Sequence, residues 1–128
     1  PDLVLRASAA RAGRQVRVTA ELTNRATHRV ALNGWLNIEL PPGWQPVSLP
    51  EGCVSGNPVR CQLGDLGKGQ SVGLGLMLSG EGDGRVLFRA GASNGDFPAG
   101  DTRASVTPAR AGAQAARREE GGSGGGGG

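Results

Sequence analysis

Apolar and polar residues alternate along most of the first 107 positions of this chain. The clearest alternation runs through residues 15–23, where every second residue is apolar. The same pattern returns in residues 36–40, 71–78 and 86–90. Because successive side chains of a strand point to opposite faces, a period of two predicts β-strands that bury one face.

Shorter apolar stretches between turn residues predict further strands at residues 2–6, 29–32, 44–49, 59–63 and 102–107. The Asn33-Gly34 pair is either a hairpin turn or a β-bulge. We therefore expect an all-β fold, an immunoglobulin-like β-sandwich of about 7–8 antiparallel strands. The residues expected to form its core are Val16, Val18, Leu22, Leu36, Ile38, Leu40, Leu74, Leu76, Val86, Phe88 and Val106.

The composition agrees with a single small β-domain. Glycine and proline supply 24 and 8 of the 128 residues, and they fall mainly between the apolar stretches. This placement favours many turns over a collagen-like or wholly disordered chain. Tyrosine is missing and the only tryptophans are Trp35 and Trp44, so we expect an aliphatic core.

The formal net charge is +3, and the basic residues are arginines apart from Lys68. Residues 1–29 are rich in arginine, but no aromatic residues lie between these arginines to stack on bases, so we expect no nucleic-acid partner. No run of 18 apolar residues occurs, and we expect no membrane insertion of this segment. Because the chain begins with Pro1 rather than methionine, we expect a processed product or an excised fragment.

Cys53 and Cys61 are the only cysteines, and turn residues 56–58 lie between them. Their spacing suits a local disulfide, which adds about 2–3 kcal/mol of stability in the loop-entropy model. Free thiols are the alternative. A structural zinc site needs four ligands, and two cysteines with one histidine in the chain make a poor one. A redox pair usually has two residues between its cysteines, whereas seven separate these two. A disulfide indicates an oxidising compartment, and therefore export.

Residues 91–95 match the G-x-S-x-G pattern of a nucleophile elbow, with Ser93 at the serine position. That motif needs a strand-to-helix turn and a later histidine, whereas the only histidine, His28, comes earlier. We therefore interpret these residues as a glycine-rich strand end.

Calcium is the metal that the loop residues suit best. Asp83, Asn94, Asp96 and Asp101 would supply oxygen ligands if their loops met at one end of the sandwich. Calcium needs six or more oxygens, and no EF-hand spacing exists. We expect no catalytic residue, no cofactor and no metal ligand.

Five short motifs follow one another along the chain. They are the strand end at residues 16–24, L-P-P-G at 40–43, the paired cysteines with C-Q-L-G-D-L at 61–66, G-Q-S-V at 69–72, and a closing segment at 96–106. Their order resembles the bacterial conserved-repeat domain, the domain-of-unknown-function-eleven family. Asp101 departs from the asparagine that is usual in that family. The resemblance implies an immunoglobulin-like surface module without catalytic residues.

We place the domain at residues 1–108. Residues 109–120 are rich in alanine and arginine, and residues 121–128 are glycine apart from one serine. We expect residues 109–128 to be a flexible tail or linker that does not dock on the core. The glycine tract is either a linker added in cloning or a segment resembling the start of a bacterial sorting signal.

These patterns favour a non-catalytic structural or adhesive module of an exported bacterial protein, acting as a spacer, a stalk or a cell-surface interaction domain. We expect an extracellular or cell-surface monomer. Its expected partners are neighbouring domains of the parent protein, or extracellular proteins or glycans. The alternatives are an accessory domain of a secreted hydrolase and a carbohydrate-binding module, which the lack of tyrosine and of clustered tryptophans weakens.

Overall fold

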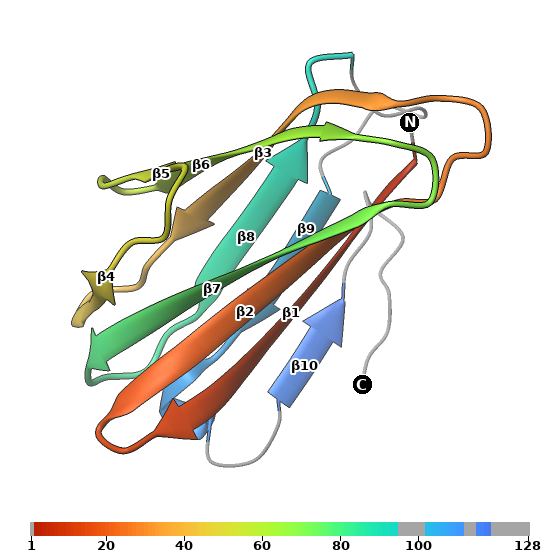
Figure 1. Cartoon of the computed structure of the whole chain (residues 1–128). Helices are drawn as coiled ribbons and strands as arrows, with labels where there is room; N and C mark the ends of the chain where they lie inside the picture. The colour runs from red at the N-terminus through yellow and green to blue at the C-terminus, as the bar shows by residue number, and fades with distance from the viewer. Residues whose placement is uncertain (1, 95–101, 112–114, 119–128) are drawn as a thin grey trace.

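Two antiparallel β-sheets pack face to face in this chain (Figure 1). The computed structural model describes residues 2–94, 102–111 and 115–118. Sheet I has the strand order β10-β1-β2-β7-β4, and sheet II has the order β5-β6-β3-β8-β9. The strands are β1 (Leu3–Ala12), β2 (Gln15–Asn24), β3 (Ala31–Glu39), β4 (Trp44–Ser48), β5 (Cys53–Val54), β6 (Val59–Leu66), β7 (Ser71–Gly80), β8 (Val86–Gly91), β9 (Thr102–Val106) and β10 (Ala115–Arg118).

The strand order follows the scheme of immunoglobulin constant domains. Strands β1, β2, β7 and β4 are arranged as A-B-E-D, and β3, β8 and β9 are arranged as C-F-G. The β5–β6 hairpin comes between β4 and β7 in the chain and extends sheet II beside β3. The predicted β-sandwich is confirmed, and eight of its strands have five or more residues. The short β5 and β10 were not predicted.

Strand β2 forms as the alternating pattern predicts. Its four apolar side chains, Val16, Val18, Ala20 and Leu22, are at most 5% exposed. It pairs with β1 over ten residues and with β7 over eight. Its polar residues therefore face solvent, in register with those of its two neighbours.

Strand β1 is longer than the predicted residues 2–6 and continues to Ala12. Ala7 and Ala9 face the core and are 3% and 1% exposed. Alanine adds little to a hydrophobic pattern, which is why the second half of this strand is weak in the sequence. Pairing with β2 along its whole length stabilises it.

A β-bulge joins the two predicted strands at residues 29–32 and 36–40 into the single strand β3. The pairing of β3 with β6 shifts on both sides of Gly34, and Asn33 has a φ of 50°. Asparagine tolerates this left-handed conformation better than most residues. The bulge is therefore correct, and the alternative hairpin turn is wrong.

The core between the sheets is largely the one predicted. Nine of the eleven predicted core residues are at most 4% exposed, while Leu40 and Leu74 are partly buried. Leu74 lies in the part of β7 that β4 leaves uncovered, because β4 pairs only with residues 77–80. Leu40 follows the last residue of β3, where the sandwich ends.

The side chain of Asn24 is fully buried and connects three segments. Its Oδ1 accepts hydrogen bonds from the backbone N–H groups of Asp2 (3.3 Å) and Ala26 (3.1 Å). Its Nδ2 donates to the carbonyls of Arg29 (2.8 Å) and Leu66 (3.2 Å). A buried amide with these partners fixes the start of β1, the β2–β3 turn and the end of β6 together.

The structured part of the chain extends beyond the predicted boundary at residue 108. The 3₁₀ turn η1 (Pro108–Arg110) is followed by Ala111, which is fully buried and accepts a 2.9 Å hydrogen bond from Arg11 N. Strand β10 then pairs with β1. The expected tail is therefore wrong for residues 109–111 and 115–118. The other tail residues lie outside the described part.

Within the described ranges, no helix is long and apolar enough to cross a membrane.

Candidate functional site

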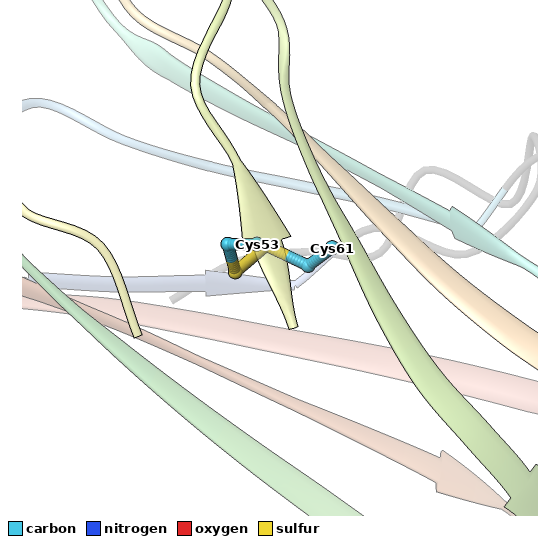
Figure 2. The surroundings of a disulfide bond; sticks show 2 residues. All are labelled: Cys53 and Cys61. Carbon is cyan, nitrogen blue, oxygen red and sulfur yellow. A yellow bond between two sulfur atoms is a disulfide. The ribbon is translucent and has the colours of Figure 1, made fainter. Parts of the chain in front are cut away.

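Cys53 and Cys61 form a disulfide, as predicted (Figure 2). The two residues are a cross-strand pair of β5 and β6, with Cα atoms 4.0 Å apart. Cys61 is buried in the core and Cys53 packs against it. A 2.9 Å hydrogen bond from Gln62 N to Gly52 O continues the pairing. The disulfide therefore attaches the β5–β6 hairpin to sheet II.

Trp44 belongs to the core. It is 8% exposed, and its indole Nε1 donates a 3.0 Å hydrogen bond to the carbonyl of Gly82. This bond ties the start of β4 to the loop between β7 and β8. Trp44 therefore has a structural position and is not part of an exposed binding face.

Trp35 lies on the outer face of sheet II and is half-buried. Its neighbours Gly34 and Leu36 are buried. Its indole lies over Gly91, its cross-strand partner on β8. A Cβ on Gly91 would stand 2.6 Å from the ring atom Cζ2 of Trp35. The glycine thus makes room for the ring to lie across β8.

A row of polar residues crosses the same face beside Trp35. Arg60 on β6 is paired with Asn37 on β3, which is paired with Arg89 on β8, which is paired with Arg103 on β9. Val54 extends the row on β5. We call Arg60, Asn37, Arg89 and Arg103 the arginine row. At about 4.8 Å per strand spacing, the backbones of its outer arginines are about 14 Å apart.

The side chains of the arginine row point away from the core. Their chain neighbours Leu36, Ile38, Val59, Cys61, Phe88, Ala90 and Ala104 are all at most 2% exposed. Since side chains alternate between the two faces of a strand, the row faces solvent. All three arginines are exposed.

The acidic residues of sheet II lie outside the arginine row. Its five strands contain only Glu39 and Asp65. Glu39 is opposite Leu87 in the neighbouring row, and Asp65 Oδ1 accepts a 2.8 Å hydrogen bond from Asn33 N at the bulge. Within the described strands of sheet II, no carboxylate occupies a position of the row itself.

The outer face of sheet I differs in charge. A shallow groove of about 550 Å³ crosses it, with Gly73 and Gly75 among its lining residues. Arg6 and Glu21 line the same groove and stand opposite each other on β1 and β2. Opposite charges therefore face each other there, in contrast to the arginine row.

Ser93 of the G-x-S-x-G match makes local contacts. Its N–H and its hydroxyl both donate to the carbonyl of Leu32, at 2.7 and 3.0 Å, and its Oγ accepts a 3.3 Å bond from Asn33 Nδ2. The serine thus fastens the end of β8 to the β3 bulge. His28 is exposed in the β2–β3 turn.

Of the four residues considered for calcium, the two described ones, Asp83 and Asn94, do not meet at one end of the sandwich. Asp83 precedes β8 and Asn94 follows it, so the strand separates them. The Asn94 amide is bound to the backbone of Leu32 and Val30, at 3.0 and 2.9 Å. Asp96 and Asp101 lie outside the described residues. Within the described ranges, no three His, Cys, Asp or Glu residues are grouped as a metal site requires.

The sequence alone did not single out the arginine row. In the sequence, each of its arginines is recognisable only as a polar residue at an outward position of a strand. Which strands are neighbours, and in which register, depends on the tertiary fold. The row is therefore a finding of the structure.

No family model and no curated protein matches this chain. The resemblance to the conserved-repeat domain therefore stays a prediction based on its motifs. Among those motifs, L-P-P-G follows the end of β3 and the paired cysteines form the disulfide.

Proposed function

We propose that this chain is a non-catalytic structural and adhesive module of an exported bacterial protein. It holds other parts of that protein at a distance and contacts its surroundings through an exposed sheet face. The observation that carries this proposal is the direction of β1 and β9, which suits a module that bears tension.

Strands β1 and β9 run in the same direction on facing sheets. The Thr102 hydroxyl donates a 3.3 Å hydrogen bond to Leu3 O at the start of both strands. Past their ends, Arg11 N donates to Ala111 O at 2.9 Å. Both strands run opposite to β8 (Figure 1). The chain therefore enters β1 at one end of the sandwich and leaves β9 at the other.

Tension between these two ends acts along the strands. It loads the ten-residue pairing of β1 with β2, and the pairing of β8 with β9, in shear. In shear, many hydrogen bonds must break together, and each buried backbone group that loses its partner costs free energy. This arrangement resists extension better than one in which hydrogen bonds break one after another.

The disulfide supports export. Disulfides persist in oxidising compartments and are rare in the cytosol. The Cys53–Cys61 bond also holds β5, which has only two residues, on the edge of sheet II. In a module that works outside the cell, this covalent bond keeps the short strand β5 attached to the sheet.

Pulling the full chain by its two ends in a force spectrometer tests the proposal. We expect β10 to separate first, because it pairs with β1 on one side only, and the sandwich then to unfold in one cooperative event. With the disulfide intact, that event should be shorter by about 24 Å than after reduction. Eight residue steps of about 3.5 Å stay closed, and the two Cα atoms are still 4.0 Å apart across the bond. Gradual extension without a distinct unfolding event would contradict the load-bearing role.

A further inference from the structure

One half of β7 has a neighbouring strand on one side only. Strand β2 pairs with β7 from Ser71 to Leu78, whereas β4 pairs with it only from Met77 to Gly80, at the end that carries the arrowhead in Figure 1. Among the described strands, none pairs with residues 71–75 on the β4 side. We call residues 71–75 the free segment of β7.

The free segment directs backbone hydrogen-bonding groups toward its open side. On the β2 side, Asn24 N donates a 2.9 Å bond to Gln70 O, just before β7. Because the direction alternates along an antiparallel strand, even-numbered residues of β7 face β2 and odd-numbered residues face the other side. The 3.1 Å bond that Glu81 N donates on the β4 side fits this alternation. The N–H and C=O groups of residues 71, 73 and 75 therefore point outward, beyond the end of β4.

The free segment has none of the features that protect sheet edges. Exposed edges are commonly protected by proline, by charged side chains or by being very short. Three other edge strands have such a feature, since β4 contains Pro46, β5 has two residues and β9 carries Arg103. The free segment reads S-V-G-L-G, with neither a charge nor a proline. It is therefore open to pairing with a further strand.

We propose that this further strand is the free segment of a second copy of the chain, so that two β7 strands join antiparallel about a two-fold axis at Gly73. In this register Gly73 pairs with its own counterpart, and Ser71 pairs with Gly75 of the other copy. Each of these pairs exchanges two hydrogen bonds through groups that point outward. The inference goes beyond the proposed function, does not depend on it, and replaces the monomer expected from the sequence with a weak dimer.

The inner face of the free segment suits pairing with itself. Val72 and Leu74 pack against the core but stay partly exposed, since no described strand covers them at this edge. In the proposed register each Val72 lies opposite Leu74 of the other copy. Apolar surface of both copies is therefore removed from water, which favours the pairing. An unrelated peptide would use the same backbone groups, but this match of apolar positions is a property of the segment with itself.

The outer face of the free segment brings no like charges together. Gly73 and Gly75 line the shallow groove on sheet I, and glycines inside a strand often mark a place where another backbone approaches closely. Glu21 is the cross-strand partner of Gly73 on β2. In the joined sheet the two Glu21 residues are three strand spacings of about 4.8 Å apart, which exceeds the Debye length of about 8 Å at physiological salt.

Sedimentation equilibrium of the full chain measures the association. The interface uses one short segment of each copy, and small interfaces belong to weak complexes. We therefore expect a dissociation constant between about 10 μM and about 1 mM. The average mass should rise from one chain toward two as the concentration increases to about 1 mM, and it should not exceed two.

Charge variants at Gly73 test the two-fold axis. Gly73→Lys and Gly73→Glu each place like charges directly opposite in the dimer, so each alone should weaken association about fivefold. Mixed in equal amounts, they place opposite charges there and should recover the affinity. The nearest atom to a Cβ at Gly73 is Ala20 O at 3.9 Å, so both variants should fold. Ser55→Lys adds a charge at an exposed position between β5 and β6 and should change the affinity less than about twofold.

Cysteine variants test the register. Gly73→Cys should form a disulfide-linked dimer with oxidised glutathione, because the opposed Cα atoms are about 5.5 Å apart. Gly75→Cys should not link to itself, since its two copies are four residue steps, or about 14 Å, apart. It should link to Ser71→Cys when these two variants are mixed.

Four outcomes overturn the proposal. The mass of one chain at every concentration would show that no second copy binds, and growth beyond two chains would place the contact on another edge. A mixture of the two charge variants that associates no better than either alone would exclude the two-fold axis at Gly73. Linking of Gly75→Cys to itself as fast as Gly73→Cys would exclude the register. Thermal melts verify that all variants are folded.

Discussion

The hydroxyl of Thr102 donates a 3.3 Å hydrogen bond to the carbonyl of Leu3, which is 99 positions away in the chain. The bond is buried and connects the first residues of β1 and β9 across the two sheets. It therefore joins the two strands through which the proposed load enters and leaves the sandwich.

Removing this hydroxyl should weaken the fold. Thr102→Val keeps the volume but leaves a buried carbonyl with one partner fewer, so we expect a loss of about 1 kcal/mol in the free energy of unfolding. For a domain of this size, the melting temperature should fall by about 4 °C. Thr102→Ser keeps the hydroxyl and serves as the control. If Thr102→Val melts no lower than Thr102→Ser, the bond does not stabilise the fold.

The contact between Trp35 and Gly91 makes a second prediction. A methyl group at Gly91 would stand 2.6 to 3.1 Å from three atoms of the indole, so Gly91→Ala must displace the ring. We expect a loss of about 1–3 kcal/mol and a red shift of tryptophan fluorescence. At Gly75 the nearest atom is 3.8 Å away, so Gly75→Ala should stay within about 0.5 kcal/mol. Equal effects at the two glycines would contradict the position of Trp35.

The disulfide makes a third prediction. Cys53→Ala with Cys61→Ala opens a short loop and should lower the free energy of unfolding by about 2–3 kcal/mol in the loop-entropy model. Urea denaturation of the oxidised protein and of the double variant measures this difference through the midpoint. An unchanged midpoint would show that the disulfide does not stabilise the domain.

Ser105 makes a fourth prediction, in the opposite direction. Its Oγ is buried and has no hydrogen-bond partner among the described residues. A buried hydroxyl without a partner costs free energy, so Ser105→Ala should raise stability by about 1 kcal/mol. In Ser8→Ala, by contrast, the 2.6 Å bond to Thr19 Oγ1 is lost, and stability should stay equal or fall. If Ser105→Ala melted below Ser8→Ala, the Ser105 hydroxyl would not be a buried group without a partner.

The sequence predicts most strands but not their arrangement, for physical reasons that particular residues illustrate. The alternation in residues 15–23 predicts β2 because large aliphatic side chains mark its inner face. The sequence pattern does not predict the second half of β1, because its inner residues, Ala7 and Ala9, are small. The sequence does not predict the burial of Ala111 for the same reason: alanine is only weakly hydrophobic, and the tertiary fold places it in the core.

The candidate site depends on register, which local sequence does not determine. A shift of one residue would move Arg89 from the outer face to the core side of sheet II. The bulge at Gly34 sets how β3 meets β6, and so brings Arg60 opposite Asn37. The cysteine spacing, in contrast, is a local signal, and the disulfide could be predicted from it.

The most direct test of the load-bearing role compares two directions of pulling on the same fold. Handles at Asp2 and Arg110 load β1 and β9 along their length. Handles at Asp2 and Arg25, which are joined by a 2.7 Å backbone hydrogen bond, pull β1 and β2 apart one pair at a time. All three positions are exposed, so attachment should leave the core intact. At one loading rate, we predict a clearly higher rupture force for the first pair of handles, and an equal or lower force would contradict the proposed function.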